Sequence, residues 1–263
     1  MAGGSSAAML YVLGLWWLGT GVVLKMVWLD RATIRWSVGG SAVLAVIGLV
    51  GLGWSARIAD PASAYLGFAC ALAVWAFHEL TFLLGLVTGP RKIACPPEAR
   101  GWARFAAATS VVIHHELALA ATLGAVALVQ WGQPNQVGTW TFFVLWAMRL
   151  SAKLNVFLGV RNLTEQFVPA HLRYMLGYFR RARMNALMPF SIVLPSIVVV
   201  QLATDALATD ASAFVRVRGT LLGTILALAI LEHICLAVPL PDALLWRWAI
   251  RKKSARLHST EAP

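Results

Sequence analysis

Charged residues are scarce in this chain. Asp, Glu, Lys and Arg make up 13% of its 263 residues, whereas hydrophobic residues make up 59%. Soluble domains usually carry about 25% charged and roughly 45–50% apolar residues. The chain also lacks the short alternating segments of a transmembrane β-barrel. These absences exclude an ordinary soluble domain and predict an all-α, polytopic membrane helix bundle.

Cysteine is also sparse, and several catalytic signatures are missing. Cys70, Cys95 and Cys235 show no paired spacing, which excludes a disulfide framework and a thiolate metal site. There is no Gly-rich phosphate loop, nucleophile elbow or Cys-His arrangement. Because no internal repeat or low-complexity linker divides the chain, we expect one integral membrane domain over residues 1–263.

Long apolar runs predict about seven transmembrane helices. Several of them reach the roughly 20 residues that a helix needs to cross a hydrocarbon core of about 30 Å. The sixth is short and contains Pro189 and Pro195, and its failure to span would invert the topology of everything after it. The predicted spans are 7–28, 37–55, 62–87, 104–130, 138–160, 187–204 and 214–238.

The basic residues predict the orientation. The loops after spans one, three and five, together with the C-terminal tail, hold fifteen Lys and Arg residues, whereas the alternate loops hold Arg57 alone. Basic residues collect in cytoplasmic loops, so the N-terminus should lie outside and the C-terminus in the cytoplasm. This asymmetry also explains the net charge of +11 without a nucleic-acid partner.

Two cytoplasmic segments, 168–184 and 241–256, have the pattern of amphipathic helices lying in the membrane interface. In the first, Leu172, Met175, Leu176 and Phe179 form an apolar stripe opposite arginines. In the second, Asp242 can cap a helix, and Trp246 and Trp248 suit the headgroup layer. Both segments are expected to contact the lipid bilayer.

Ionisable side chains interrupt four of the predicted spans at a similar depth. At about 1.5 Å per residue, the "HE" of span three and the "HHE" of span four both lie about 15 Å from the cytoplasmic surface. An isolated charge at this depth is costly, so these groups should face one another. The predicted polar layer consists of His78, Glu79, His114, His115, Glu116, Arg149, Lys153, Asn155, Glu232 and His233.

The three consecutive residues of span four cannot all contribute to one site. Successive helical residues are about 100° apart, so His114, His115 and Glu116 sweep roughly 200° around the helix. At least one of them should face a different neighbour.

Several roles for this layer remain open. It could be a structural hydrogen-bonded network, or a binding site in which Arg149 and Lys153 hold an anionic ligand. Imidazole and carboxylate together also suit iron, manganese or zinc, although the Glu-x-x-His spacing of di-iron bundles is absent. A histidine could instead be the axial ligand of a tetrapyrrole, or the layer could relay protons. The candidate metal ligands are Glu79, His115, Glu116, Glu232 and His233.

Three stretches resemble the PuhE family, the photosynthetic complex assembly proteins encoded among reaction-centre assembly genes of purple phototrophic bacteria. They are "FHELTFLLGLVTGPRK" (77–92), "IHHELAL" (113–119) and "KLNVFLGVRNLTEQFVPAHLRYMLGYFRR" (153–181). The resemblance implies a multi-pass inner-membrane protein that assists reaction-centre or light-harvesting assembly and handles bacteriochlorophyll. It implies photosynthetic complex subunits or pigment-synthesis proteins as partners. Beyond the polar layer it marks Arg161, Asn162, Glu165 and His171, without a catalytic mechanism.

Two functional hypotheses follow. The first is a non-enzymatic assembly factor whose polar layer holds a ligand or a partner. The alternative is a membrane metalloenzyme that oxidises a pigment or lipid intermediate with a His/Glu-ligated metal.

Overall fold

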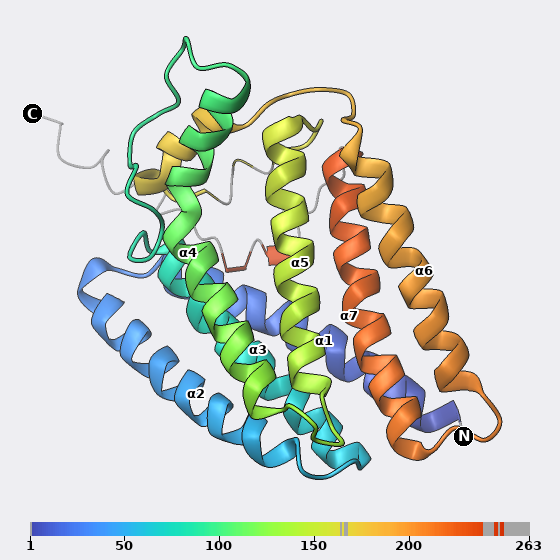
Figure 1. Ribbon diagram of the computed structural model, residues 1–263. Coiled ribbons are helices and arrows are strands. Elements are labelled where there is room, and N and C mark those ends of the chain that lie inside the picture. The colour runs from blue at the N-terminus through green and yellow to red at the C-terminus, as the bar shows by residue number, and fades with distance from the viewer. Residues whose placement is uncertain (1, 164, 166–167, 239–244, 247, 250–263) are drawn as a thin grey trace, which may run out of the picture.

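The computed structural model describes residues 2–163, 165, 168–238, 245–246 and 248–249, and within these it contains helices and no strand (Figure 1). The elements follow the chain without long interruptions. They are α1 (Ala2–Val27), η1 (Arg31–Thr33), α2 (Ile34–Ser55), α3 (Pro61–Leu83), α4 (Gly101–Val129), α5 (Val137–Leu158), η3 (Ala170–Tyr178), α6 (Leu187–Leu207) and α7 (Ala213–Ala237).

All seven long helices are long and apolar enough to cross a membrane, which confirms the predicted fold class. The sixth also spans, because α6 continues through Pro195 and places Pro189 in its first turn, where a missing N–H matters little. Asn185 fixes the start of this helix. Its Oδ1 accepts hydrogen bonds from the backbone N–H groups of Leu187 and Met188.

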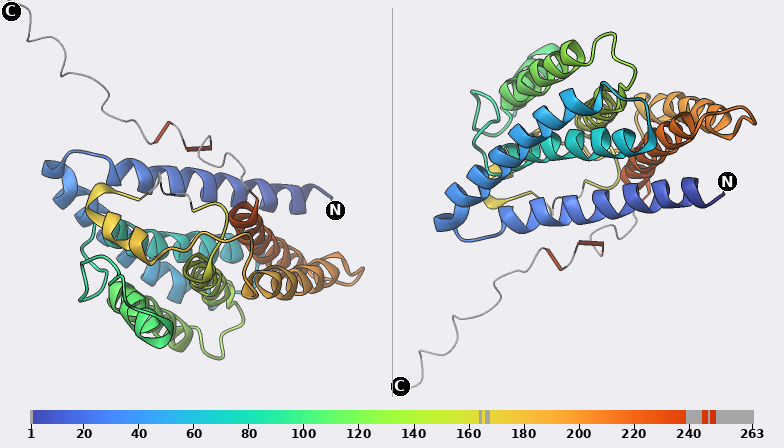
Figure 2. Two further views of the ribbon diagram at one scale, coloured as in Figure 1. Left: turned by 90° about the horizontal axis from the view of Figure 1, so that it is seen from above. Right: turned by 90° about the horizontal axis from the view of Figure 1, so that it is seen from below.

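Helix α3 lies at the centre of the bundle, where it contacts α1, α2, α4, α5 and α7. Asp60 caps its first turn by accepting from Ser63 N, and Pro61 occupies the first helical position. Helix α1 lies along one side of the bundle in both panels of Figure 2, and it packs mainly against α7 and α3.

The segment predicted as an interfacial helix over 168–184 differs in type and in environment. It forms the shorter 3₁₀ helix η3, and its buried residues Leu172, Met175 and Tyr178 pack against Phe82 and Val111 of the bundle instead of facing lipid. Their spacing of three residues matches the three residues per turn of a 3₁₀ helix. Of the predicted apolar stripe, Leu172 and Met175 are buried, whereas Leu176 and Phe179 are half-buried, and Phe179 still packs against this cluster.

Most of the second predicted interfacial segment, 241–256, lies outside the described residues. The described part contacts α1: the indole N–H of Trp246 donates to Trp17 O at 3.3 Å, and the rings of Trp17 and Trp248 lie 5.7 Å apart. The two tryptophans that were predicted for the headgroup layer thus pack against Trp17 of α1.

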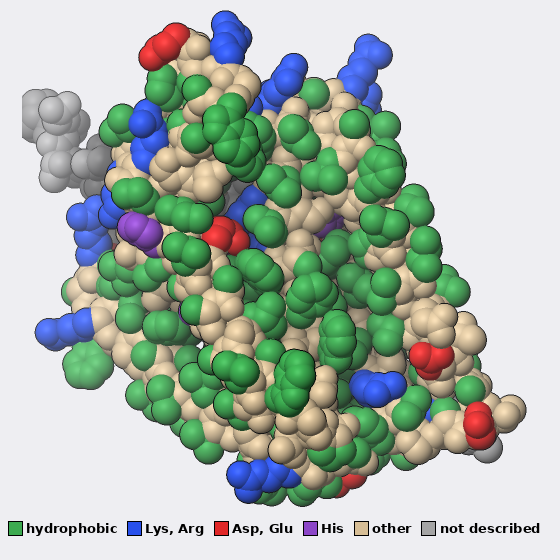
Figure 3. All heavy atoms as spheres, in the orientation of Figure 1, with side chains coloured by type: hydrophobic (Ala, Val, Ile, Leu, Met, Phe, Trp, Pro, Cys, Tyr) green, Lys and Arg blue, Asp and Glu red, His purple; other side chains and the backbone are tan. Residues whose placement is uncertain are grey.

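Lys and Arg side chains gather at the end of the molecule where α4 begins (Figure 3), in agreement with the predicted orientation. This orientation stays a prediction, and reporter fusions test it. Alkaline phosphatase inserted after Gln133, between α4 and α5, should be active, whereas the same insertion after Ala182, between α5 and α6, should be inactive. The reversed pattern would contradict an external N-terminus.

Candidate functional site

The stretches 77–92, 113–119 and 153–181 come together at one end of the bundle. After α3 ends, the chain turns back along α4, and the carbonyl of Thr88 accepts a hydrogen bond from His115 N at 3.0 Å. Arg91 N donates to the Ser110 carbonyl at 3.2 Å. Non-helical backbone at membrane depth is tolerated only where protein or water satisfies it, and here α4 supplies the partners.

Gly89 permits this close approach. A Cβ atom at this position would lie 2.2 Å from Ser110 O and 2.6 Å from the backbone carbon of Val111. Any side chain would push the loop away from α4. The glycine in "VTGPRK" therefore sets the distance between the loop and the helix that carries His115 and Glu116.

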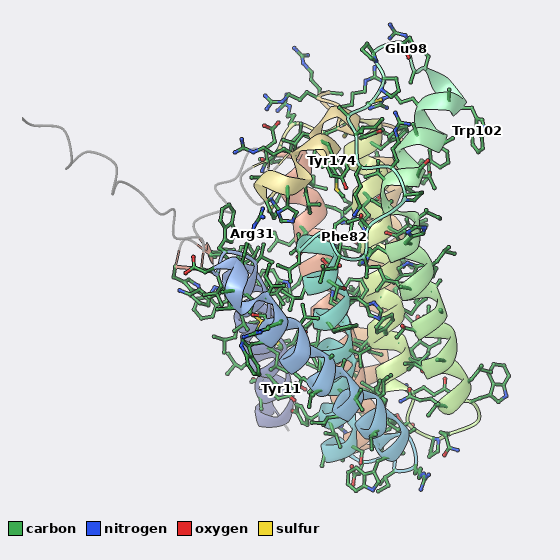
Figure 4. The ribbon with its side chains drawn as sticks, turned by 90° about the vertical axis from the view of Figure 1, so that its left-hand side faces the viewer. Tyr11, Arg31, Phe82, Glu98, Trp102 and Tyr174 are labelled. Carbon is green, nitrogen blue, oxygen red and sulfur yellow. The ribbon has the colours of Figure 1, made fainter. Side chains whose placement is uncertain are left out.

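The third stretch, 153–181, contacts the end of α3, the loop after it and the first turn of α4. His171 in η3 donates a ring N–H to Leu83 O at 2.9 Å, at the end of α3. Arg91 Nε donates to the Tyr178 hydroxyl, and Arg104 donates to the Tyr178 carbonyl, both at 2.6 Å. In Figure 4, Phe82 lies near Tyr174 of this segment, and Trp102 lies in the first turn of α4.

Beneath the junction, two ion pairs link α3, α4 and α5. Glu79 Oε2 accepts from Arg149 Nη2 at 3.2 Å, and Glu116 Oε1 accepts from Lys153 Nζ at 2.5 Å. Trp146 donates its indole N–H to the other Glu116 oxygen at 3.1 Å. The two carboxylates and two cations balance, which keeps the energy of holding four charges within a membrane bundle low.

His115 lies beside Glu79, with its Nε2 3.8 Å from Glu79 Oε1 and its ring centroid 4.4 Å from that of Phe82. The residue is fully buried. Among the described residues, neither of its ring nitrogens has a hydrogen-bond partner, and the same holds for Glu79 Oε1 and Thr88 Oγ1. Because a buried polar atom without a partner is costly, these atoms indicate a place for a water molecule or a polar ligand group. We call Glu79, His115, Glu116, Arg149 and Lys153 the charged cluster.

A second set of polar side chains, without charged residues, links α5, α6 and α7. His233 Nε2 lies 3.0 Å from Ser151 Oγ, which donates to Ser191 Oγ at 2.9 Å. Asn155 Nδ2 also donates to Ser191 Oγ at 2.9 Å. Asn155 and His233, both expected in one layer with the glutamates, therefore belong to a separate network that holds these three helices together.

Three other predicted site residues point elsewhere. His78 Nε2 lies 3.0 Å from Thr122 Oγ1, seven residues after His115 on α4 and outside the charged cluster. Glu232 is exposed and accepts from the Trp16 indole of α1 at 3.3 Å, although its charge still interacts with that of Arg149. His114 is exposed. The expectation that the three residues of "HHE" cannot converge is thus confirmed.

This arrangement separates the candidate metal ligands. Glu79 and His115 are neighbours, whereas Glu116 pairs with Lys153, and Glu232 and His233 contact α1 and α5 respectively. Within the described part of the chain, no group of three or more His, Cys, Asp or Glu side chains is placed to hold a metal ion. The geometry therefore offers the metalloenzyme hypothesis no support.

The cations of the charged cluster are its accessible groups. The Arg149 side chain is 44% exposed and the Lys153 side chain 25% exposed, against 11% and 13% for Glu79 and Glu116. Among the described residues, Nη2 is the one guanidinium nitrogen of Arg149 with a hydrogen bond, so the other two can bind a further group. The cluster can therefore offer N–H donors to an anionic or carbonyl oxygen.

Sequence reasoning missed Trp146, Thr88 and Gly89. Trp146 could have been found, since it precedes Arg149 by three residues and Lys153 by seven and so shares their face of α5. Thr88 and Gly89 carried no local signal, because their role depends on a loop lying against α4.

Comparison with known proteins gives two matches, each covering most of the chain. A family model described as "Protein of unknown function (DUF3623)" matches residues 4–256. An "Uncharacterized 30.4 kDa protein in puhA 5'region" of Rhodobacter capsulatus is 37% identical over 242 residues, which cover 89% of this chain and 87% of that protein. No solved structure matches. The family match includes all three stretches that form the site.

Proposed function

This chain belongs to the DUF3623 family, and on that premise we propose that it is an assembly factor for a bacterial photosynthetic reaction centre or light-harvesting complex. By its description, the Rhodobacter capsulatus relative is encoded in the 5′ region of puhA, which points to photosynthesis. The resemblance to PuhE proteins agrees with this context. The membrane would then be the cytoplasmic or intracytoplasmic membrane of a phototroph.

The observation that carries the proposal is the convergence of the three family-like stretches on the charged cluster. Two purely structural ion pairs would be expected to bury their cations. Yet 44% of the Arg149 side chain is exposed, and two of its guanidinium nitrogens have no hydrogen bond to the described residues. Intramembrane charges that remain accessible usually mark a ligand or partner site. We assign Arg149 and Lys153 to contact the ligand or partner, and Glu79, Glu116 and Trp146 to position them.

Handling of bacteriochlorophyll is the finer part of this proposal. A neutral histidine imidazole would supply a nitrogen ligand to the pigment's magnesium ion. His115 does not fit this role, because its ring is fully buried between Phe82 and Glu79. His114 does fit, because it is exposed on a membrane-spanning helix and makes no hydrogen bond to the described residues through its ring.

Deletion of the gene in its phototrophic host tests the assembly role. We expect less assembled reaction centre or antenna complex, measured by the near-infrared absorption of membranes and by complex levels on native gels. Unchanged spectra and complex levels in the deletion strain would refute the assembly role.

Complementation of the deletion strain with His114→Leu tests the pigment ligand separately. An apolar side chain at an exposed position in the span should not reduce folding, yet complex levels should fall to those of the deletion strain. Leu117→Ala is the matched control, since Leu117 lies one turn away and is 58% exposed. Full complementation by His114→Leu would reject the ligand role of His114 and leave the assembly role standing.

A further inference from the structure

A hollow of about 360 Å³ lies outside the charged cluster, where the loop after α3 meets α4. Its lining consists of Pro90, Arg91, Lys92, Ile93 and Ser110. It therefore combines two adjacent cations and a hydroxyl with the apolar surfaces of a proline and an isoleucine. It is an open depression of the surface and not an enclosed cavity.

Among the described residues, Arg91 is anchored by a hydrogen bond from its Nε atom, and its terminal nitrogens can bind another group. Its Nε donates to the Tyr178 hydroxyl at 2.6 Å, and that hydroxyl donates to Ile93 O at 3.1 Å. Tyr178 is buried, with 4% of its surface exposed, so this anchor is rigid. The two terminal nitrogens of Arg91 have no partner among the described residues, and a guanidinium fixed in this way can donate two parallel hydrogen bonds to a phosphate.

No acid neutralises this site. Within the described part of the chain, neither Arg91 nor Lys92 has a carboxylate within 4.0 Å. The nearest acid in sequence, Glu98, lies in the loop before α4, at the end of the molecule where α4 begins (Figure 4). Two neighbouring cations without a counter-charge favour an anionic occupant.

The position of the hollow along α4 suits the lipid headgroup layer. The 29 residues of α4 extend about 43 Å, which exceeds the hydrocarbon thickness of about 30 Å by about 13 Å, or roughly nine residues. If this excess lies at the basic end, Ser110 stands at the edge of the hydrocarbon core. Nearby apolar side chains are exposed, with 62% for Ile93 and 77% for Trp102, as expected where a protein surface enters the interface.

We propose that this hollow binds the phosphate group of an anionic phospholipid, with Arg91 and Lys92 contacting the phosphate and Ser110 contacting the headgroup. This site is distinct from the charged cluster and does not depend on the proposed assembly role. A bound lipid there would fix the loop 84–92 against α4, whose backbone supports His115.

Native mass spectrometry of the full-length protein in mixed micelles tests the proposal. Phosphatidylglycerol should be retained in preference to phosphatidylcholine. Lys92→Gln, which changes an exposed residue, should lower retention about fivefold, since a basic residue near an anionic membrane contributes about 1 kcal/mol. Arg91→Lys should also weaken retention, because it keeps the charge and loses the two parallel donors. Arg31→Gln is the control, since it removes an exposed cation from the same predicted membrane side.

Three results would overturn the assignment. One is equal retention of the two lipids, and another is an equal loss in Arg31→Gln and Lys92→Gln. The third is displacement of phosphatidylglycerol by millimolar inorganic phosphate or glycerol phosphate, which would assign the hollow to a water-soluble phosphate compound. A thermal melt of each variant shows whether Arg91→Lys remains folded. If Arg91→Lys does not fold, the lipid retention of Lys92→Gln alone tests the assignment.

Discussion

Replacing Glu116 by Gln should destabilise the protein by about 3 kcal/mol, and replacing Lys153 by Met in the same chain should restore most of the loss. Removal of one partner from a buried ion pair leaves an uncompensated charge and typically costs about 3–5 kcal/mol. The lower end applies because the Lys153 side chain is 25% exposed. The double variant has no unpaired charge and should lie within about 1 kcal/mol of the wild type.

The free energy of unfolding of the four proteins can be measured by SDS titration in mixed micelles with Trp fluorescence. Additive losses in Glu116→Gln and Lys153→Met, with no recovery in the double variant, would show that the 2.5 Å pair carries little energy. Arg181→Gln is a suitable control, because its pair with Glu165 is exposed and should contribute less than about 1 kcal/mol.

The same double variant separates a structural role of the charged cluster from a binding role. If Lys153 only neutralises Glu116, the double variant should recover both stability and complementation of the deletion strain. If Lys153 also contacts a ligand or partner, the double variant should fold and still fail to support complex assembly. We expect the second result, since Lys153 and Arg149 are the exposed members of the cluster.

The sequence predicted the spans and the existence of buried ion pairs for physical reasons that are local. Hydrophobic length is a property of each segment, and a charge within a span must find a partner whatever the fold. Glu79, Glu116, Arg149 and Lys153 accordingly pair with one another. Depth along the helix axis, counted at about 1.5 Å per residue, was sufficient to bring these four groups together.

The sequence did not show how each helix is rotated about its own axis. Depth counting treats Glu232 and His233 alike, yet neighbouring residues on a helix point about 100° apart. His233 faces Ser151 of α5, and Glu232 consequently turns toward Trp16 of α1. The same rotation buries His115 and exposes His114. Which residue of each adjacent pair faces inward depends on how α1, α4 and α7 pack, which no single segment determines.

The loop between α3 and α4 was beyond prediction because its contacts are non-local. Residues 84–92 have no repeating pattern. The first four bond back to α3, whereas Thr88 and Arg91 bond to His115 and Ser110 of α4, 27 and 19 residues further along the chain. The span predicted to end at 87 ends at Leu83, and the remaining residues instead form the turn. This turn decides where His115 and the hollow lined by Arg91 and Lys92 lie.

Gly89→Ala and Gly124→Ala should have opposite effects, although the chemical change is the same. A Cβ at position 89 would lie 2.2 Å from a backbone oxygen of α4, and backbone cannot move aside cheaply. Overpacking of this kind costs about 1–3 kcal/mol, and Gly89→Val should exceed that range. Gly124 lies in α4 with nothing within 4 Å of a built Cβ, so alanine there should stabilise the helix by about 0.5–1 kcal/mol.

SDS titration gives the stability of both variants, and complementation of the deletion strain gives their function. Gly89→Ala should also reduce complex assembly, because displacing the loop breaks the bond between Thr88 O and His115 N and moves the helix segment that carries Glu116. A Gly89→Ala protein with wild-type stability would mean that the loop does not rest on α4 as described. A destabilised protein with full complementation would mean instead that the placement of His115 is unimportant for assembly.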